Sequence, residues 1–149
     1  MNIYDLKSED RTPFLIEELT IVWEKSVKST HSFLSIEEIK KIKTYIPDIF
    51  KNISRLIIMK NTDKHIIAFM GIDDHKIEML FVVPEEMGKG VGKKMIQYGI
   101  NNYSINEVTV NEQNLRARGF YEHMGFKVYK RTDCDEQGNP YPLLYMVLE

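Results

Sequence analysis

The pattern of apolar and polar residues along the chain predicts a mixture of strands and helices. Short runs rich in Ile, Val and Phe, which are typical of strands, occur at 3–6, 55–60, 65–73, 76–83, 107–110, 127–131 and 143–148. Apolar residues at helical spacing occur at 13–28, 91–103 and 114–124. A further helix is expected to begin after Ser35, because Ser35 and Glu38 fit a capping box, and to end before Pro47.

The predicted order of elements is therefore β-α-α-β-β-β-α-β-α-β-β. Strands and helices interleaved in this way indicate an α+β or mixed α/β fold, with helices on the faces of a mixed sheet. The 149 residues fit one compact domain, 1–149, which is large enough to bury roughly two-thirds of its unfolded surface.

A glycine loop lies at the centre of the chain. The apolar strand that ends near Pro84 is followed by Gly88, Gly90 and Gly92, and then by an amphipathic helix. This arrangement binds phosphate, because glycines let the backbone approach an anion and the helix start adds free amides and positive potential. A glycine-rich turn without a ligand is the alternative.

The loop fits two common phosphate motifs poorly. A nucleoside-triphosphate loop needs Ser or Thr after Gly-Lys to hold magnesium, whereas Gly92 is followed by Lys93 and Lys94. A dinucleotide fingerprint needs G-x-G-x-x-G after an early strand, whereas this loop reads G-x-G-x-G in the middle of the chain. A nucleotide-binding phosphotransferase is therefore a weak hypothesis.

Composition narrows the class of partner. The net charge of −2 and the pI near 6.1 give no overall attraction to nucleic acid, so basic groups near the loop must hold an anionic ligand, and cationic substrates are allowed. Cys134 is the single cysteine, and the four histidines lack metal-ligand spacing, so we expect neither a disulfide nor a metal site. The apolar run 66–72 is too short to span a bilayer and residues 1–5 lack a signal-peptide core, so we expect no membrane partner and a cytoplasmic location.

Two ordered motifs resemble the GCN5-related N-acetyltransferase (GNAT) superfamily. The first is the V-x-P strand end with its glycine loop, and the second is N-x(6)-Y-x(3)-G-F, which runs from Asn114 through Tyr121 to Phe126. Residues 23–35 and 138–144 also resemble a small bacterial, YjaB-like subgroup. The resemblance implies a mostly antiparallel, twisted sheet with helices on both faces. One departure is Met87, where the family's loop usually has Gln or Arg.

The resemblance also implies a cofactor site for acetyl-CoA. The pantetheine arm would bond the backbone of one strand, the pyrophosphate would meet the loop amides, and Asn114 would bond the arm. The residues carried over are Leu80, Phe81, Val82, Met87, Gly88, Lys89, Gly90, Val91, Gly92, Lys93 and Asn114. An Asn at position 114 is equally explained as a helix N-cap, and the two roles are compatible.

Acetyl transfer to an amine needs a positioned thioester, a neutral amine, a stabilised oxyanion and a proton for the leaving thiolate. Tyr121 matches the family tyrosine that supplies this proton, although an aromatic on the buried face of a helix is its alternative. Glu78 is the first candidate for the general base, because period-two alternation places it on one strand face with Lys76, Leu80 and Val82. An ordinary surface glutamate at a strand end is its alternative, and a water chain to solvent could take the proton instead.

His31 is the second candidate base, since the loop between the two early helices walls the acceptor pocket in this superfamily and imidazole titrates in a useful range. Capping of the second helix is its alternative. Trp23, Phe33 and Tyr145 could line the same pocket or belong to the core.

The leading hypothesis is direct acetyl transfer from acetyl-CoA to a primary amine, on either a small molecule or a protein lysine. Its rival is a non-catalytic CoA-binding regulatory module of the same fold. The sequence leaves the acceptor and the oligomeric state open, and a homodimer is compatible with it.

Overall fold

One seven-stranded sheet runs through the computed structural model, which describes residues 2–149. The strands are β1 Asn2–Leu6, β2 Arg55–Lys60, β3 Ile66–Asp73, β4 Lys76–Val82, β5 Glu107–Asn111, β6 Phe126–Thr132 and β7 Leu143–Leu148. Across the sheet they lie in the order β1-β2-β3-β4-β5-β7-β6, and only β4 and β5 are parallel. The predicted mixed, mostly antiparallel sheet is confirmed.

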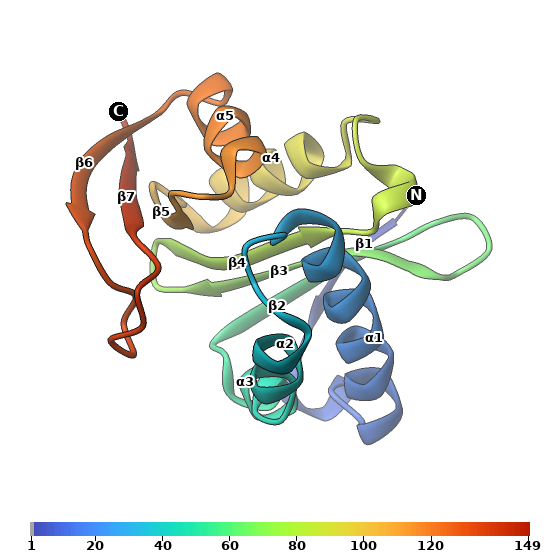
Figure 1. The fold of residues 1–149 in the computed structure, drawn as a ribbon. Coiled ribbons are helices and arrows are strands. Elements are labelled where there is room, and N and C mark those ends of the chain that lie inside the picture. The colour runs from blue at the N-terminus through green and yellow to red at the C-terminus, as the bar shows by residue number, and fades with distance from the viewer. Residues whose placement is uncertain (1) are drawn as a thin grey trace.

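Helices cover both faces of this sheet, as predicted (Figure 1). The first group, on one face, is α1 Pro13–Thr30, α2 Ile36–Lys43 and α3 Ile46–Asn52; α4 Val91–Tyr103 and α5 Leu115–His123 lie on the other. Two short 3-10 turns, Ser8–Asp10 and Pro84–Glu86, complete the order. Ser35 and Glu38 form the expected capping box at the start of α2.

The prediction of one helix between Ser35 and Pro47 was incomplete. The structure has two helices there, because α2 ends at Lys43 and α3 starts at Ile46 with Pro47 in its first turn. A proline is tolerated in a first turn, where its missing N–H would have no helical partner. Pro47 therefore opens a helix instead of only stopping one.

The core lies on both faces of the sheet, and its buried cluster includes residues of α1 and α3 on one face and of α4 and α5 on the other. Phe50 of α3 meets Phe69 of β3 edge to face at 5.1 Å, and Leu19 and Trp23 of α1 are buried beside them. Fully burying such side chains stabilises a fold by about 1.5–3 kcal/mol each. Trp23 thus belongs to the core and does not line the acceptor pocket.

The sheet opens between its two parallel strands. Only Lys76 with Glu107 and Ile77 with Val108 are paired there, whereas β5 stays paired with β7 along its whole length. After these pairs β4 and β5 separate. The separation leaves the backbone of the last β4 residues without a partner strand on that edge.

A β-bulge coincides with the start of the opening. On β3 the neighbours Gly71 and Ile72 pair with Met79 and Ile77, so Glu78 is the extra residue on β4. The bulge reverses the alternation, and Lys76 consequently lies on the opposite face from Leu80 and Val82. The prediction that Lys76, Glu78, Leu80 and Val82 share one face was therefore wrong.

Candidate active site

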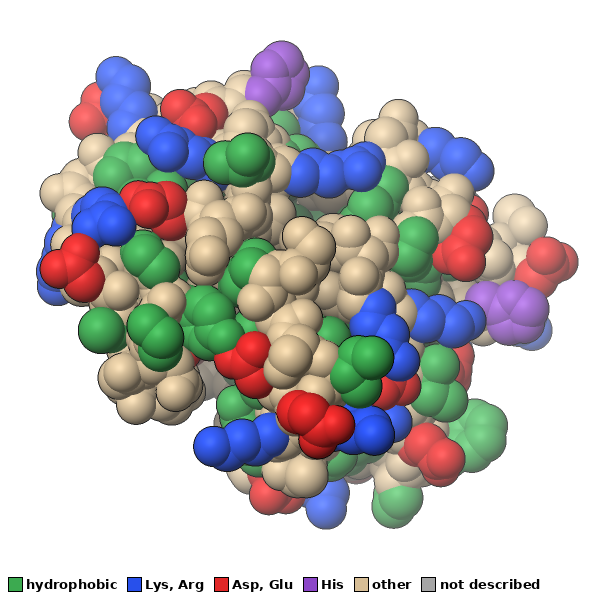
Figure 2. Space-filling model, in the orientation of Figure 1, with side chains coloured by type: hydrophobic (Ala, Val, Ile, Leu, Met, Phe, Trp, Pro, Cys, Tyr) green, Lys and Arg blue, Asp and Glu red, His purple; other side chains and the backbone are tan. Residues whose placement is uncertain are grey.

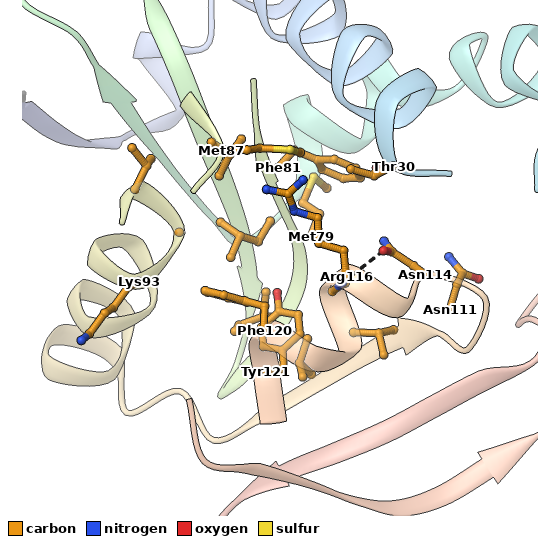
Figure 3. Close-up of a pocket in the computed structure, with 18 of the residues that line it drawn as sticks. Thr30, Met79, Phe81, Met87, Lys93, Asn111, Asn114, Arg116, Phe120 and Tyr121 are labelled. Carbon is orange, nitrogen blue, oxygen red and sulfur yellow. Dashed lines mark hydrogen bonds between the residues drawn. The ribbon is translucent and has the colours of Figure 1, made fainter. Parts of the chain in front are cut away.

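A cavity of about 600 Å³ occupies the opening between β4 and β5. Its walls are β4, the glycine loop, β5, the start of α5 and the end of α1 (Figure 3). All but one of the predicted site residues line it, namely His31, Glu78, Leu80, Phe81, Val82, Met87, Gly88, Gly90, Val91, Gly92, Lys93, Asn114 and Tyr121. The exception is Lys89, which is exposed and lies 3.7 Å from the Glu86 carboxylate.

The glycine loop presents its amides without protein partners. Gly88 and Gly90 have φ values of +78° and +81°, a left-handed conformation that favours glycine. Within residues 2–149 no carbonyl accepts a hydrogen bond from the amides of 88 to 93, whereas the Met87 amide donates to Pro84 O at 3.3 Å. The free donors therefore begin one residue later than the sequence predicts, and they surround the start of α4 as an anion site requires.

Tyr121 is buried, with 5% of its surface exposed, but its phenol is directed into the cavity (Figure 3). Phe120 and Phe126 pack against the ring at 5.1 and 5.5 Å. No hydrogen bond to the phenol is found in the part of the chain that the structure describes. Burial raises the pKa of Tyr121 well above its ordinary value, so the phenol stays protonated and free to donate.

Asn114 is both a helix cap and a cavity residue. Its Oδ1 accepts the amide of Ala117 at 3.1 Å, which satisfies a free donor in the first turn of α5. The Nδ2 group remains available to donate toward the cavity. The two roles that the sequence allowed for Asn114 are thus geometrically compatible.

Glu78 lies at the bulge, where the strands begin to separate. The pKa of its carboxyl is raised, first by burial, while Lys76 opposes the shift and Glu136 and Asp73 add to it. Although much of the side chain is exposed, the carboxyl lines the cavity. A raised pKa makes Glu78 a stronger base than an ordinary glutamate.

His31 ends α1 instead of capping α2, since its amide donates to Val27 O at 2.8 Å. Burial lowers the pKa of its imidazole to about 4. The Thr30 hydroxyl donates to Ser26 O at 2.8 Å, so the 2.8 Å contact between Thr30 Oγ1 and His31 Nδ1 favours a proton on Nδ1. His31 is therefore a neutral imidazole with Nε2 as its acceptor atom.

Aromatic rings extend the wall of the cavity from His31 toward the segment between β6 and β7. Phe33 and Phe81 lie 5.3 and 6.0 Å from the His31 ring, and Tyr141 lies 5.7 Å from Phe33. The Tyr141 phenol donates to the Glu38 carboxylate, which ties the β6–β7 segment to the start of α2. Phe33 thus lies beside the cavity, as the sequence allowed.

Several cavity residues were not singled out from the sequence. They are Thr30, Met79, Glu86, Thr109, Asn111, Arg116, Phe120 and His123. Thr109 Oγ1 is buried and has no hydrogen-bond partner in residues 2–149. Asn111 lies just before the motif that begins at Asn114 and Arg116 lies within it, and this proximity is the only signal that could have identified them.

The comparisons with known proteins agree with this geometry. Residues 24–142 match the model of the acetyltransferase (GNAT) domain. The chain belongs to the GNAT family. Peptidyl-lysine N-acetyltransferase YjaB of Salmonella typhimurium LT2 is 33% identical over 131 residues, which are 88% of this chain and 90% of that protein. The Escherichia coli K12 protein of the same name is 34% identical over 86% of each chain.

Solved structures show the same fold. The apo-form of Escherichia coli YjaB superposes with a TM-score of 0.84 at 32% identity, covering 99% of this chain and 97% of that one. A PaiA N-acetyltransferase from Thermoplasma acidophilum, solved with coenzyme A, gives a TM-score of 0.67 at 23% identity over 100% and 99% of the two chains. The second likeness supports the fold alone.

Family membership makes this chain an acetyltransferase that moves an acetyl group from acetyl-CoA to an amine. Membership in this family excludes the two alternative hypotheses, a non-catalytic CoA-binding module and a nucleotide-binding phosphotransferase. The residues present fit the donor, because the loop offers unpaired amides for phosphates and the β4 edge offers backbone groups for an extended arm. Acetyl-CoA supplies the reactive thioester when it is bound.

None of the helices described is long and apolar enough to cross a bilayer. No three His, Cys, Asp or Glu side chains within residues 2–149 are grouped as a metal ion would require.

Proposed function

We propose that the acceptor is the ε-amine of a lysine in a protein or peptide. The observation that carries this proposal is the entrance at the bulge, where Glu78 lines the cavity. Lys76, Glu136 and Asp73 all lie close enough to affect the pKa of Glu78, so three carboxylates against one ammonium leave the entrance net acidic. Such an entrance favours a cationic amine over a neutral or acidic one. The names of the two YjaB relatives point to lysine within a polypeptide.

The proposed roles assign each proton to a named atom. Glu78 accepts a proton from the ammonium, and His31 Nε2 accepts a hydrogen bond that orients the resulting amine. The amine nitrogen then forms a bond to the acetyl carbon as the carbon–sulfur bond breaks, and the nitrogen releases its second proton to water. Tyr121 donates its phenolic proton to the departing sulfur and regains one from solvent, so no covalent enzyme intermediate is needed.

The high pKa of Tyr121 shapes this last step. Because burial disfavours the phenolate, Tyr121 first stabilises the sulfur as a hydrogen-bond donor and releases its proton only as negative charge builds there. Donation of a hydrogen bond first and of the proton second is consistent with the Tyr121 phenol, which has no other hydrogen-bond partner in the described chain.

The acceptor can be tested with matched peptides. A lysine-containing peptide should gain one acetyl group by mass spectrometry and release CoA thiol, whereas the same peptide with Arg in place of Lys should do neither. Spermidine, a small polyamine, should react with a kcat/KM at least about tenfold lower, because it lacks the flanking backbone. Faster reaction of spermidine than of every lysine peptide would assign the site to small amines.

Three predictions from the sequence belong to this proposal. They are a single domain over 1–149, a cytoplasmic location and a homodimer. Cell fractionation tests the location, and sedimentation tests the oligomeric state.

A further inference from the structure

We infer that Arg116 binds the diphosphate of acetyl-CoA from the wall opposite the glycine loop, and that it supplies the polar side chain that Met87 lacks. The inference rests on the donor of the proposed function and not on its acceptor. It concerns a residue outside the cofactor set that the resemblance implied.

Arg116 is distinguished by its lack of an intramolecular partner. The chain has five arginines. Arg11 donates to backbone carbonyls near α3, Arg55 stacks on the Tyr103 ring at 4.1 Å, Arg118 pairs with Glu122, and Arg131 pairs with Glu112 and Asp133. Within residues 2–149 Arg116 makes no ion pair, hydrogen bond or ring stack. Its guanidinium is therefore available to a ligand.

The direction of the side chain indicates which ligand. Arg116 lies in the first turn of α5, and it lines the cavity together with Asn114. In Figure 3 the side chain extends from α5 across the cavity toward the wall that carries Met87 and Phe81. The guanidinium thus faces the loop whose amides from 88 to 93 are free.

The other cations near the loop are poorly placed to replace it. Lys89 lies beside Glu86 and outside the cavity lining. Lys93 is part of the lining at the start of α4, but its ammonium points away from the cavity (Figure 3). The lining also contains the carboxylates of Glu78 and Glu86. A diphosphate entering this cavity needs a cation to offset them, and a planar guanidinium can bond two phosphate oxygens at once.

Figure 2 shows the setting on the surface. Lys and Arg side chains lie around the upper part of the hollow, beside α5 and the glycine loop, and elsewhere on this face basic and acidic side chains are mixed. The cations around the upper part of the hollow suit a donor whose phosphates enter from that side.

The test compares Arg116→Gln with Arg118→Gln, which removes the same charge from the same helix. Calorimetric titration with CoA, without acceptor, measures donor binding alone. Arg116→Gln should weaken CoA binding about tenfold and Arg118→Gln less than twofold, and the difference should shrink in 0.5 M salt, because the side chain is exposed. Arg116→Lys should recover part of the lost affinity, since lysine keeps the positive charge but cannot bond two phosphate oxygens at once as a guanidinium can.

Two truncated donors identify the phosphate. Dephospho-CoA lacks the 3′-phosphate and should show the same tenfold loss, whereas the KM for acetylpantetheine, which has no phosphate, should be unchanged by Arg116→Gln. Equal CoA affinity in the two Gln variants would overturn the inference. A loss confined to CoA and absent with dephospho-CoA would overturn the diphosphate assignment. A changed KM for acetylpantetheine would place Arg116 at the acceptor instead. The titrations with CoA and dephospho-CoA contain no amine, so their results are independent of whether lysine is the acceptor.

Discussion

Burial acts in opposite directions on the two side chains that compete for the amine proton. It raises the pKa of Glu78 and lowers that of His31 to about 4. At neutral pH the carboxylate is thus the stronger base of the two, and the imidazole is already neutral. We therefore assign proton removal to Glu78 and orientation of the amine to His31.

Substituting Glu78→Gln tests this assignment through the pH profile. A base must be deprotonated to act, so the raised pKa of Glu78 moves the acidic limb of kcat/KM above the ordinary carboxylate range. We expect Glu78→Gln to lower kcat/KM at pH 7 about 10- to 100-fold and to remove this limb. The control is Glu85→Gln, an exposed carboxylate outside the cavity lining. A variant that keeps both the rate and the limb would exclude Glu78 as the base.

For single residues, the sequence could predict the site residues whose positions are set by a motif. It could not predict those whose role depends on their neighbours in the folded structure. Tyr121 and Asn114 sit at set positions in N-x(6)-Y-x(3)-G-F, and both line the cavity. The lack of a partner for Arg116 depends instead on which side chains the fold brings near it, and the orphaned hydroxyl of Thr109 depends on how β5 leaves β4. Neither condition is visible along the chain.

Among the elements, the glycine loop and the start of α4 carry the donor site. The boundaries of α4 match the prediction at 91–103, because apolar spacing and the loop define a long amphipathic helix. The extra helix α3 and the bulge at Glu78 were missed. A proline such as Pro47 can either end a helix or open one, so the sequence alone did not predict α3. The bulge arises from the pairing of β4 with β3, and the alternation of residues along β4 carries no information about that pairing.

Two glycines with nearly the same backbone conformation allow an effect on CoA binding to be distinguished from an effect of backbone strain on stability. Gly90 and Gly138 have φ values of +81° and +83°, and an added Cβ would meet no atom within 4 Å at either position. Alanine at either should therefore cost about 1–2 kcal/mol of folding free energy in urea unfolding. Only Gly90→Ala should also weaken CoA binding, by about fivefold or more, since it distorts the amides of the loop. Equal CoA affinities in the two variants would contradict a role for this loop.

In the molecule as a whole, one parallel pair within an antiparallel sheet creates the site. The connection from β4 to β5 crosses one face of the sheet through α4, so the start of α4 lies at the carboxyl end of β4. The insertion of β7 between β5 and β6 holds β5 in place while β4 diverges from it. The order of elements was largely predictable, but the position of β7 was not, because non-local pairing leaves no local signal.

The most direct test of the account is the turnover of Tyr121→Phe with saturating acetyl-CoA and a lysine peptide. The lost hydroxyl has no partner in residues 2–149, so the variant should fold normally and bind CoA within about twofold of wild type. Its kcat should fall about 10²- to 10⁴-fold, because the departing sulfur loses its proton donor. A kcat equal to that of the wild type would contradict the proposed role of Tyr121.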